Sequence, residues 1–547
     1  MCSIPYLRAP PYHKNMNKTL NTLALIFLTF SLAAQENLPK DYLTPAFHKG
    51  RREAFRALMP AGSVALIFAF PERTFSKDVD HPYHQNPDLY YLSGYGEPDA
   101  LLILFKDMQG QGDTAYNELF FVRKRDPLQE TWTGRRLGVE GVKNKLGFKR
   151  VFEGKDFASY PIDFSKYSVA LGASIPNDVK SDETGSDLLG LMKSAKAKGF
   201  KESANPDLDN TKQMVSQRAT YGNRTRIIAF LNRPGEMYEN FRKDPEIAAL
   251  LSATDSASYE KARSAMGAKP SPQLAFTEIL NTLREIKTPE EMDLVRKSAR
   301  ISALAHSEVM KAITPDMSEH QAEGIQTYVH KYYGAEEEGY PPIVGAGGNG
   351  CILHYEENSA TKIDNQLLLM DVACMYHGYS ADVTRAIPAN GKFTTEQKAI
   401  YQLVYDAQEA TIGLCREGAT FQQVEAKARE VLTDGMLKLG LIKTKEEISR
   451  YYPHGCSHYI GLDVHDVGHY TDLKANMVIT VEPGIYIPAG SPCDKKWWNI
   501  GVRIEDDILI TKTGHENLSI AAPRTWQDVE KMMAQKSGFS GIVLPGL

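Results

Sequence analysis

Short apolar runs separated by polar turns fill the first part of the chain. The runs include SVALIFAF, DLYYLSGY, ALLILF and ELFFVRK, and segments such as NPD, GEPDA and GQGD stand between them. Strand-like runs that alternate with turn-forming residues predict a compact domain built around a sheet. We therefore expect an α/β domain over residues 45–180.

The middle of the chain has a different pattern. Lys, Asp, Ser and Ala dominate residues 181–286, strong strand runs are missing, and stretches such as DPEIAALLSA and ASYEKARSAM have helical spacing. This pattern predicts a helical insertion or connector. Nothing in it indicates chemistry.

Long amphipathic helices and short strands follow over residues 287–547. Four segments have the helical period: EEMDLVRKSARISALAHSEVMKAI, SEHQAEGIQTYVHKYYG, TEQKAIYQLVYDAQEATIGLC and FQQVEAKAREVLTDGMLKLG. Thr288 is a suitable N-cap for the first, with Pro289 at its first helical position. Because the strands and helices lack the regular βαβ order of a doubly wound sheet, we expect an α+β domain with helices on one face.

Length and charge add to this picture. A chain of 547 residues is too long for one ordinary domain, so at least two are expected. The net charge of −5 gives no overall basic footprint, and we expect no nucleic-acid partner.

The N-terminus has the pattern of an export signal. Lys14 and Lys18 precede LNTLALIFLTFSLAA, an apolar run that is short for a membrane span and ends in small residues. We predict a signal peptide over residues 1–34 and an exported protein, periplasmic or secreted. The alternative is an uncleaved anchor, and the charged region before the apolar run also fits translation from Met16 rather than Met1. No later stretch is apolar enough to predict stable membrane insertion.

Candidate chemistry begins in the segment LLLMDVACMYHGYSADVTR. Its two apolar runs and the connector with Gly378 predict a β-hairpin, and each run carries one aspartate, Asp371 and Asp382. A turn centred between Tyr376 and His377 would make the two aspartates face each other, whereas a bulge at Gly378 would make them diagonal neighbours. Either arrangement is costly unless a cation lies between the carboxylates. The simpler alternative is a pair of solvated loop aspartates.

Three later motifs complete the candidate site. PHGCSHYIGLDVHD contains three histidines, MVITVEPGIYI ends a strand at Glu482, and GVRIEDDILI places Arg503 and Glu505 on one face of a strand. Each motif alone is a weak signal. Together with the hairpin they supply four carboxylates and imidazole at strand ends, which is a suitable ligand set for two hard divalent ions.

This set of motifs resembles one known family. The order of MDVA, YSADVTR, HGCSHYIGLDVHD, TVEPGIYI and GVRIEDDILIT is similar to that of the dinuclear pita-bread metallopeptidases, and most closely to aminopeptidase P, the Xaa-Pro aminopeptidases. NPDLYYLSGYGEPDALLIL and ETWTGRRLG also resemble that family's N-terminal domain, whereas the polar region 180–270 departs from its compact pattern. The resemblance implies a C-terminal pita-bread catalytic domain, of the creatinase/aminopeptidase kind, after a smaller α/β domain.

The resemblance also implies a role for individual residues. The implied metal ligands are Asp371, Asp382, His458, Glu482 and Glu505. Among them, Asp371 would bind one ion bidentately, while Asp382 and Glu505 would bridge both ions.

Further positions match catalytic residues of the family. His354 and His465 match two histidines that contact the substrate and assist proton movement, and Arg503 matches an arginine that orients the ligands. Glu482, which also binds metal, or a bridging carboxylate can take the remaining proton of the nucleophile. His454 is expected to be structural or to lie behind the ligands.

The ligand set implies hydrolysis by a metal-bridged hydroxide. A water held between two divalent ions has its pKa lowered toward neutrality, and it can then attack the carbonyl of the first residue. We predict an Xaa-Pro aminopeptidase whose partners are peptides with proline at the second position. Coordination rich in carboxylate favours Mn²⁺, with Zn²⁺ and Co²⁺ as alternatives.

Two other functions fit parts of the pattern. A prolidase, which cuts only dipeptides, shares the fold, but the long N-terminal domain favours aminopeptidase P. A non-catalytic pita-bread protein that binds peptides is the second alternative, and the filled ligand set argues against it. For Trp132 a packed ring is the favoured interpretation and a rim contact the alternative. The resemblance matches Trp132 to a tryptophan that reaches a neighbouring subunit, and we expect a homo-oligomer, either a dimer or a tetramer.

Overall fold

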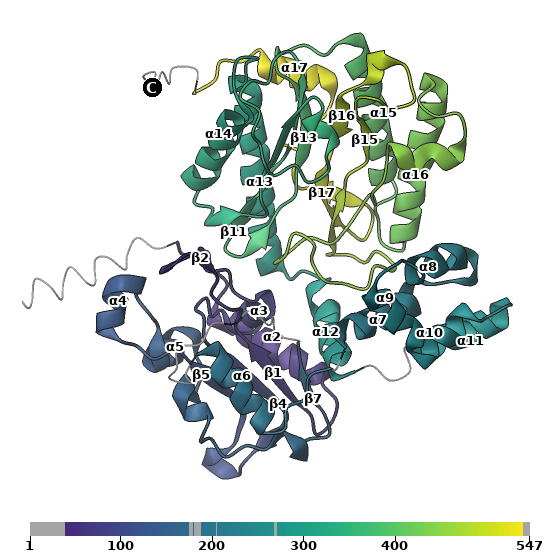
Figure 1. The fold of residues 1–547 in the computed structure, drawn as a ribbon. Helices are drawn as coiled ribbons and strands as arrows, with labels where there is room; N and C mark the ends of the chain where they lie inside the picture. Colours follow the sequence, from purple (N-terminus) through teal and green to yellow (C-terminus); the bar gives the residue numbers. More distant parts are fainter. Residues whose placement is uncertain (1–38, 174–178, 180–186, 204, 267–270, 540–547) are drawn as a thin grey trace, which may run out of the picture. The chain divides into compact units, whose positions relative to one another are not determined.

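The computed structural model describes residues 39–173, 179, 187–203, 205–266 and 271–539. The predicted signal peptide, residues 1–34, lies outside the described residues. All helices and strands below belong to one compact unit, residues 44–547, which Figure 1 colours along the chain. Within the described part of the chain, the search for a helix long and apolar enough to cross a bilayer finds none.

A five-stranded mixed sheet forms the N-terminal domain. Its strand order is β6-β5-β4-β1-β7, in which β4 pairs antiparallel with both β1 and β5, and the edge strands pair parallel with their neighbours. The strands are β1 (Val64–Phe68), β4 (Leu101–Gln109), β5 (Tyr116–Val122), β6 (Val151–Glu153) and β7 (Ala170–Gly172). Alternate apolar side chains of these strands form a core with helix α6 (Leu188–Ala197). The predicted α/β character of this domain is confirmed.

One predicted strand of this domain is a helix. The run DLYYLSGY lies in α3 (Pro87–Ser93). Asn86 accepts a hydrogen bond from the backbone N–H of Asp88, Pro87 occupies the first turn, and Gly94 ends the helix in the left-handed conformation. These capping signals decide the structure of a run whose apolar residues alone fit a strand.

Helices make up the region after this sheet. α7 to α11 pack around a separate apolar core, and α12 (Pro272–Arg284) leads from them to the C-terminal part. The five helices are α7 (Pro206–Arg218), α8 (Arg224–Leu231), α9 (Glu236–Lys243), α10 (Pro245–Leu251) and α11 (Ser256–Met266). The predicted connector therefore does not pack as one body, because its first helix, α6, contributes to the core of the N-terminal sheet.

The C-terminal domain has four long helices, as predicted. They are α13 (Pro289–Ala312), α14 (Glu319–Tyr332), α15 (Thr395–Ile412) and α16 (Phe421–Leu439). Thr288 accepts a hydrogen bond from the backbone N–H of Glu291, and the Glu291 carboxylate accepts one from the backbone N–H of Thr288, so the predicted cap is confirmed. In Figure 1 the α13–α14 pair and the α15–α16 pair flank the strands.

The strands of this domain form several small antiparallel sheets rather than one sheet. The sheet orders are β13-β10-β9, β12-β11-β8, β14-β17-β18 and β15-β16. The strands are β8 (Glu337–Glu338), β9 (Ile343–Ala346), β10 (Leu367–Asp371), β11 (Cys374–Tyr376), β12 (Tyr379–Ser380), β13 (Thr384–Pro388), β14 (Val478–Val481), β15 (Gly484–Ile487), β16 (Ile500–Arg503), β17 (Asp506–Ile510) and β18 (His515–Asn517). The predicted α+β class is confirmed.

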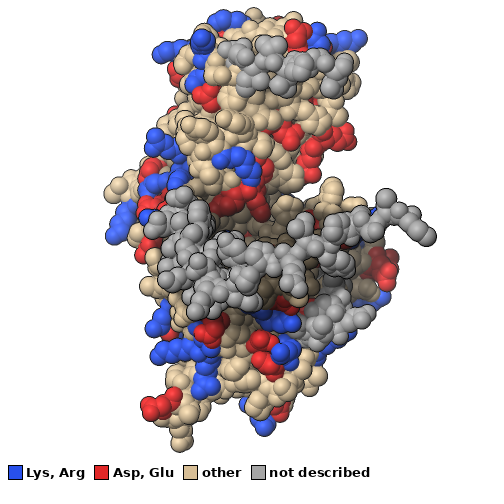
Figure 2. Space-filling view, turned by 90° about the vertical axis from the view of Figure 1, so that its left-hand side faces the viewer, with Lys and Arg blue, Asp and Glu red and all other residues tan. Residues whose placement is uncertain are grey.

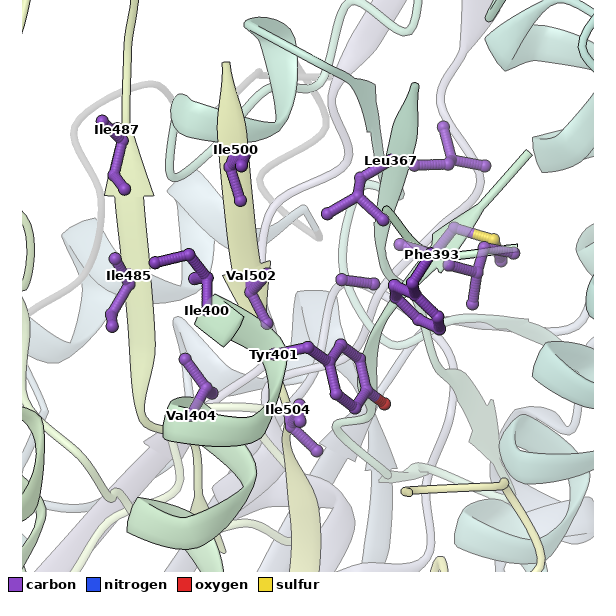
Figure 3. Close-up of a cluster of buried hydrophobic side chains, with 14 of the residues drawn as sticks. Leu367, Phe393, Ile400, Tyr401, Val404, Ile485, Ile487, Ile500, Val502 and Ile504 are labelled. Atoms are coloured by element: carbon purple, nitrogen blue, oxygen red, sulfur yellow. The ribbon is translucent and has the colours of Figure 1, made fainter. Parts of the chain in front are cut away.

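One apolar core joins the β13-β10-β9 and β15-β16 sheets to helix α15. Figure 3 shows Ile400, Tyr401 and Val404 of α15 against Ile485 and the facing side chains of β15 and β16. Burying side chains of this size stabilises the fold by about 1.5–3 kcal/mol each. Because β16 ends at Arg503 and β10 ends at Asp371, this core fixes the strand ends that carry the candidate site.

The hairpin of Asp371 and Asp382 differs from the predicted register. Its turn is centred on His377 and Gly378, both with positive φ (49° and 87°), which is the two-residue turn typical of tight hairpins. Asp371 therefore faces Thr384, and Asp382 is its diagonal neighbour on the same side. The prediction that the two aspartates face each other is wrong, and their diagonal arrangement arises without a bulge at Gly378.

Charged side chains are mixed on the surface. Figure 2 shows Lys and Arg interspersed with Asp and Glu on one face of the molecule. This mixture agrees with a net charge of only −5 over the whole chain.

Candidate metal centre

Two aspartates of the hairpin form the first part of the site. Asp371 ends β10, and Asp382 lies between β12 and β13. The hydroxyl of Tyr340 donates to Oδ1 of Asp371 at 2.5 Å and lies 2.7 Å from Oδ1 of Asp382. One phenol therefore joins two buried carboxyl groups, and the solvated-aspartate alternative is wrong.

His458 and Glu482 form the second part. Nε2 of His458 lies 3.4 Å from Oδ2 of Asp382 and 3.4 Å from Oε1 of Glu482. Nδ1 of His458 donates to the carbonyl of Tyr459 at 2.9 Å, which leaves Nε2 as the nitrogen that faces the carboxylates. The ring is thus oriented toward the carboxylates before any ligand is considered.

Strand β16 and the residues after it supply the third part. Arg503 donates to Oδ2 of Asp371, to Oγ1 of Thr384 at 3.0 Å and to the hydroxyl of Tyr486 at 2.9 Å. Thr384 in turn donates to Oε2 of Glu505 at 2.6 Å. A single guanidinium therefore orients groups from three different strands.

One cavity of about 300 Å³ lies among the aspartates, His458, Glu482 and the end of β16. Its lining includes all five predicted metal ligands and all the predicted catalytic residues. The residues that line the cavity are Leu353, His354, Asp371, Asp382, His454, Gly455, Ser457, His458, His465, Glu482, Arg503 and Glu505.

Burial and crowding of negative charge shift the pKa values of this site. Burial raises the pKa of Asp382, and the charge of Asp371 raises it further. Burial also raises the pKa of Glu505 well above its usual value and that of Glu482 to about 7. For His458, burial lowers the pKa, but the hydrogen bond to Asp382 and the charge of Glu482 outweigh it and raise the pKa to about 9.

The donor set fits divalent cations. Asp382, His458 and Glu505 each place one ligand-type atom within 4.8 Å of the others. Burial and mutual repulsion disfavour the charged forms of these carboxyl groups despite Arg503, so added positive charge would be stabilising. Oxygen donors with one imidazole could hold hard or borderline divalent ions.

Three further histidines of the predicted set line the cavity. His354 and His465 are exposed there, and the rings of His458 and His465 meet edge to face with centroids 4.4 Å apart. His454 contacts a proposed ligand and a tyrosine bound to Arg503: its Nδ1 is 3.6 Å from Oε2 of Glu482, and its Nε2 is 2.8 Å from the Tyr486 hydroxyl.

Trp132 stands apart from this cavity. Its side chain is 86% exposed on the short helix α4 (Pro127–Thr133). The interpretation of Trp132 as a packed ring within its own chain is therefore wrong.

Sequence reasoning missed several residues that contact the site. Tyr340 lies in a Glu-Gly-Tyr-Pro-Pro segment with no spacing relation to either aspartate, so no periodicity marks it. Thr384 would have been found with the correct hairpin register, because it is the partner of Asp371. Tyr486 lies two residues beyond the Pro-Gly turn that follows Glu482, but a tyrosine in a buried strand carries no sequence signal of its own.

The fold and the site together define a class of protein: a metallopeptidase with a carboxylate-rich centre. Comparison with known proteins agrees with this class. Residues 293–512 match the family described as metallopeptidase family M24, and residues 48–168 match the aminopeptidase P N-terminal domain. The Xaa-Pro aminopeptidase of Escherichia coli (strain K12) is 33% identical, with 88% of this chain and 96% of that protein aligned.

Solved structures give the same result. Escherichia coli aminopeptidase P with the inhibitor Pro-Leu has a TM-score of 0.69 and 31% identity, covering 90% of this chain and 98% of the other. The zinc-substituted Escherichia coli aminopeptidase P in complex with product has the same TM-score, 30% identity and the same coverage. The chain therefore belongs to the aminopeptidase P family of M24 metallopeptidases. It is a metal-dependent hydrolase of the Xaa-Pro aminopeptidase type.

Proposed function

We propose that the protein removes the N-terminal residue from peptides with proline at the second position, using a centre of two divalent ions. The proposed ligands are Asp371, Asp382, His458, Glu482 and Glu505. The observation that carries the proposal is the convergence of these five side chains, from four separate motifs, on one cavity of about 300 Å³.

The surrounding residues support a division of roles. Divalent ions bound here would supply an activated water and polarise the substrate carbonyl. Arg503 holds Asp371 and Thr384 in place, which keeps the carboxylates oriented. His354 and His465 are exposed at the cavity edge, where an imidazole can donate to a peptide carbonyl oxygen or carry a proton. Glu482, next to His458, is the proposed proton acceptor.

We infer that the ions are Mn²⁺. Four carboxylates with one imidazole make an oxygen-rich set, which suits Mn²⁺ better than a structural zinc site built on thiolate and imidazole. Zn²⁺ remains an alternative because one solved relative is zinc-substituted. Metal analysis of protein purified without added metal, followed by activity after reloading with each ion, distinguishes them.

The central experiment is release of the first residue from Arg-Pro-Pro and from a matched Arg-Ala-Ala peptide. Purified protein reloaded with Mn²⁺ is compared with Asp382→Ala. Cleavage of the proline peptide alone, lost in the variant, supports the proposal. Cleavage of an Arg-Pro dipeptide with no action on Arg-Pro-Pro would instead favour a prolidase, and no cleavage by protein with two bound metals would contradict the proposal.

Two further parts of the proposal concern location and assembly. The predicted signal peptide over residues 1–34 supports export, and fractionation of cells that produce the tagged full-length chain tests it. Trp132 and Leu128, at 86% and 81% exposure on α4, support a contact between subunits in a homo-oligomer. Light scattering of the wild type and of Trp132→Ser tests this contact.

A further inference from the structure

The loop between His458 and His465 is closed at its base by backbone pairing. Tyr459 and Asp466 form an antiparallel bridge, in which the N–H of Asp466 donates to the carbonyl of Tyr459 at 3.0 Å. His458 and His465 each stand one residue before a bridge partner. The pairing therefore brings their rings together, with centroids 4.4 Å apart and planes at 86°.

Under this loop, the carboxylate of Asp466 is held by two cations. Nζ of Lys287 donates to Oδ2 at 2.9 Å, and Nη2 of Arg284 donates to Oδ1. The three residues are 2–3% exposed. Oδ1 also accepts the backbone N–H of Val467 at 3.0 Å, so both carboxylate oxygens of Asp466 are fixed.

The same cations hold neighbouring groups. Arg284 also donates to Asp463, in the loop, at 2.7 Å and to Asp88, on α3, at 2.6 Å. Lys287 also donates to the carbonyl of Arg284 at 2.8 Å. The ion pairs thus join the loop to the end of α12 and to the N-terminal domain.

The loop backbone lies directly against this cluster. A Cβ at Gly461 would come within 2.0 Å of Oδ2 of Asp466 and 3.0 Å of Cε of Lys287. The carbonyl of Gly461 accepts the N–H of Ser380 at 2.7 Å, which ties the loop to the hairpin that carries Asp382. A shift of Asp466 would therefore move the loop relative to the cavity.

We propose that Asp466 is a positioning residue: paired with Lys287 and Arg284, it fixes the loop so that His465 faces the substrate beside His458. This inference rests on the proposed function of His465. Buried ion pairs often add little net stability, because desolvation of the charges offsets their attraction, whereas they fix geometry well. A fixed histidine matters because a displacement of about 1 Å can lower a rate about 100-fold.

The test is a double-mutant cycle between Asp466→Asn and His465→Gln, measured as kcat and KM on Arg-Pro-Pro. If Asp466 acts through His465, Asp466→Asn lowers kcat about 10- to 100-fold with little change in KM, and adds almost no loss in the His465→Gln background. Asp472→Asn, an exposed aspartate of the same segment, is the matched control and stays near wild type. An equal loss in both backgrounds would overturn the proposal.

A second readout does not depend on activity. Hydrogen exchange of residues 459–466 in the metal-free protein should be faster in Asp466→Asn than in the wild type and unchanged in Asp472→Asn. Unchanged exchange in Asp466→Asn would also overturn the proposal, whereas wild-type protein that cleaves no Xaa-Pro peptide would contradict only the proposed function. If Asp466→Asn does not fold, Lys287→Gln, which retains the Arg284 pair, replaces it and should have a smaller effect in the same direction.

Discussion

Tyr340 shows how one hydroxyl can hold two acidic groups together. It contacts Asp371 and Asp382 at 2.5 and 2.7 Å, and the charges of both carboxylates, after burial, raise the pKa of this phenol well above its usual value. We expect Tyr340→Phe to lower the unfolding free energy of the metal-free protein by roughly 1–3 kcal/mol, because a hydrogen bond to charged groups is lost while the groups stay buried. Denaturant unfolding measures this change.

Unfolding of Tyr340→Phe with added Mn²⁺ provides the control for this prediction. Divalent ions would neutralise the same carboxylates, so the loss in Tyr340→Phe should shrink when Mn²⁺ is added. Tyr379→Phe, which removes a hydroxyl that donates to buried Glu291 at 2.9 Å outside the cavity, should lose the same stability with and without metal. A Tyr340→Phe loss that metal does not change would contradict this account.

His469 predicts a pH dependence of stability away from the cavity. Its two nitrogens lie 3.0 Å from Glu278 and 2.9 Å from Glu285, and these hydrogen bonds raise its pKa from 6.5 to about 9. Because the folded pKa is above the unfolded value, the stabilising contribution is fully present below about pH 6.5 and is lost as the pH rises through about 9. The difference in unfolding free energy between the wild type and His469→Gln, measured by denaturant unfolding, should therefore shrink between these pH values, and a constant difference would contradict this account.

At the scale of elements, the hairpin turn is the point where backbone conformation and the site meet. Gly378 has φ +87°, and a Cβ there would lie 3.0 Å from the ring of Tyr90. Gly391 has a similar φ of +81° but open space around it. Both Gly→Ala substitutions should cost roughly 1–2 kcal/mol from the left-handed backbone. Gly378→Ala should cost more, because Tyr90 must also move.

The measurement is thermal unfolding of both variants together with kcat of each. Only Gly378→Ala should also lower kcat, since this turn sets the register that places Asp382 diagonal to Asp371. Equal losses of stability and unchanged kcat in both variants would show that the register does not depend on Gly378.

Helices were more predictable from the sequence than strand pairing. The cap at Thr288 and Pro289 marked the start of α13 because capping is local. The predicted hairpin register was wrong, because register depends on where two residues adopt positive φ. His377 gives no clear sequence signal for that conformation. The apolar residues of the DLYYLSGY run predict a strand, but the local caps at Asn86 and Gly94 make most of this run the helix α3.

The candidate site divides in the same way. The resemblance to the aminopeptidase P family implies all five proposed ligands, and they line one cavity. The contacts of Tyr340 and the ion pair of Lys287 with Asp466 are not predicted from the sequence. Such contacts join segments far apart in the chain and depend on tertiary packing. The sequence therefore predicted the proposed ligands better than the residues that hold them.

For the whole molecule, the acidic centre links stability to metal and pH. In the metal-free protein, burial raises the pKa of Asp382, Glu482 and Glu505, and for Glu482 the rise is from 4.5 to about 7. A carboxyl whose folded pKa is above its unfolded value binds more protons when folded. Stability of the metal-free protein should therefore decrease as the pH rises through this interval.

Metal should reverse this trend, because divalent ions bind only deprotonated ligands and bind the folded state. The gap in unfolding free energy between Mn²⁺-loaded and metal-free protein should thus widen from about pH 5 to about pH 7.5, reaching about 2.7 kcal/mol where free metal is about 100 times its Kd. Asp382→Ala should remove most of the gap at every pH. A gap that is constant across this range in the wild type would mean that Mn²⁺ binds elsewhere than at these carboxylates.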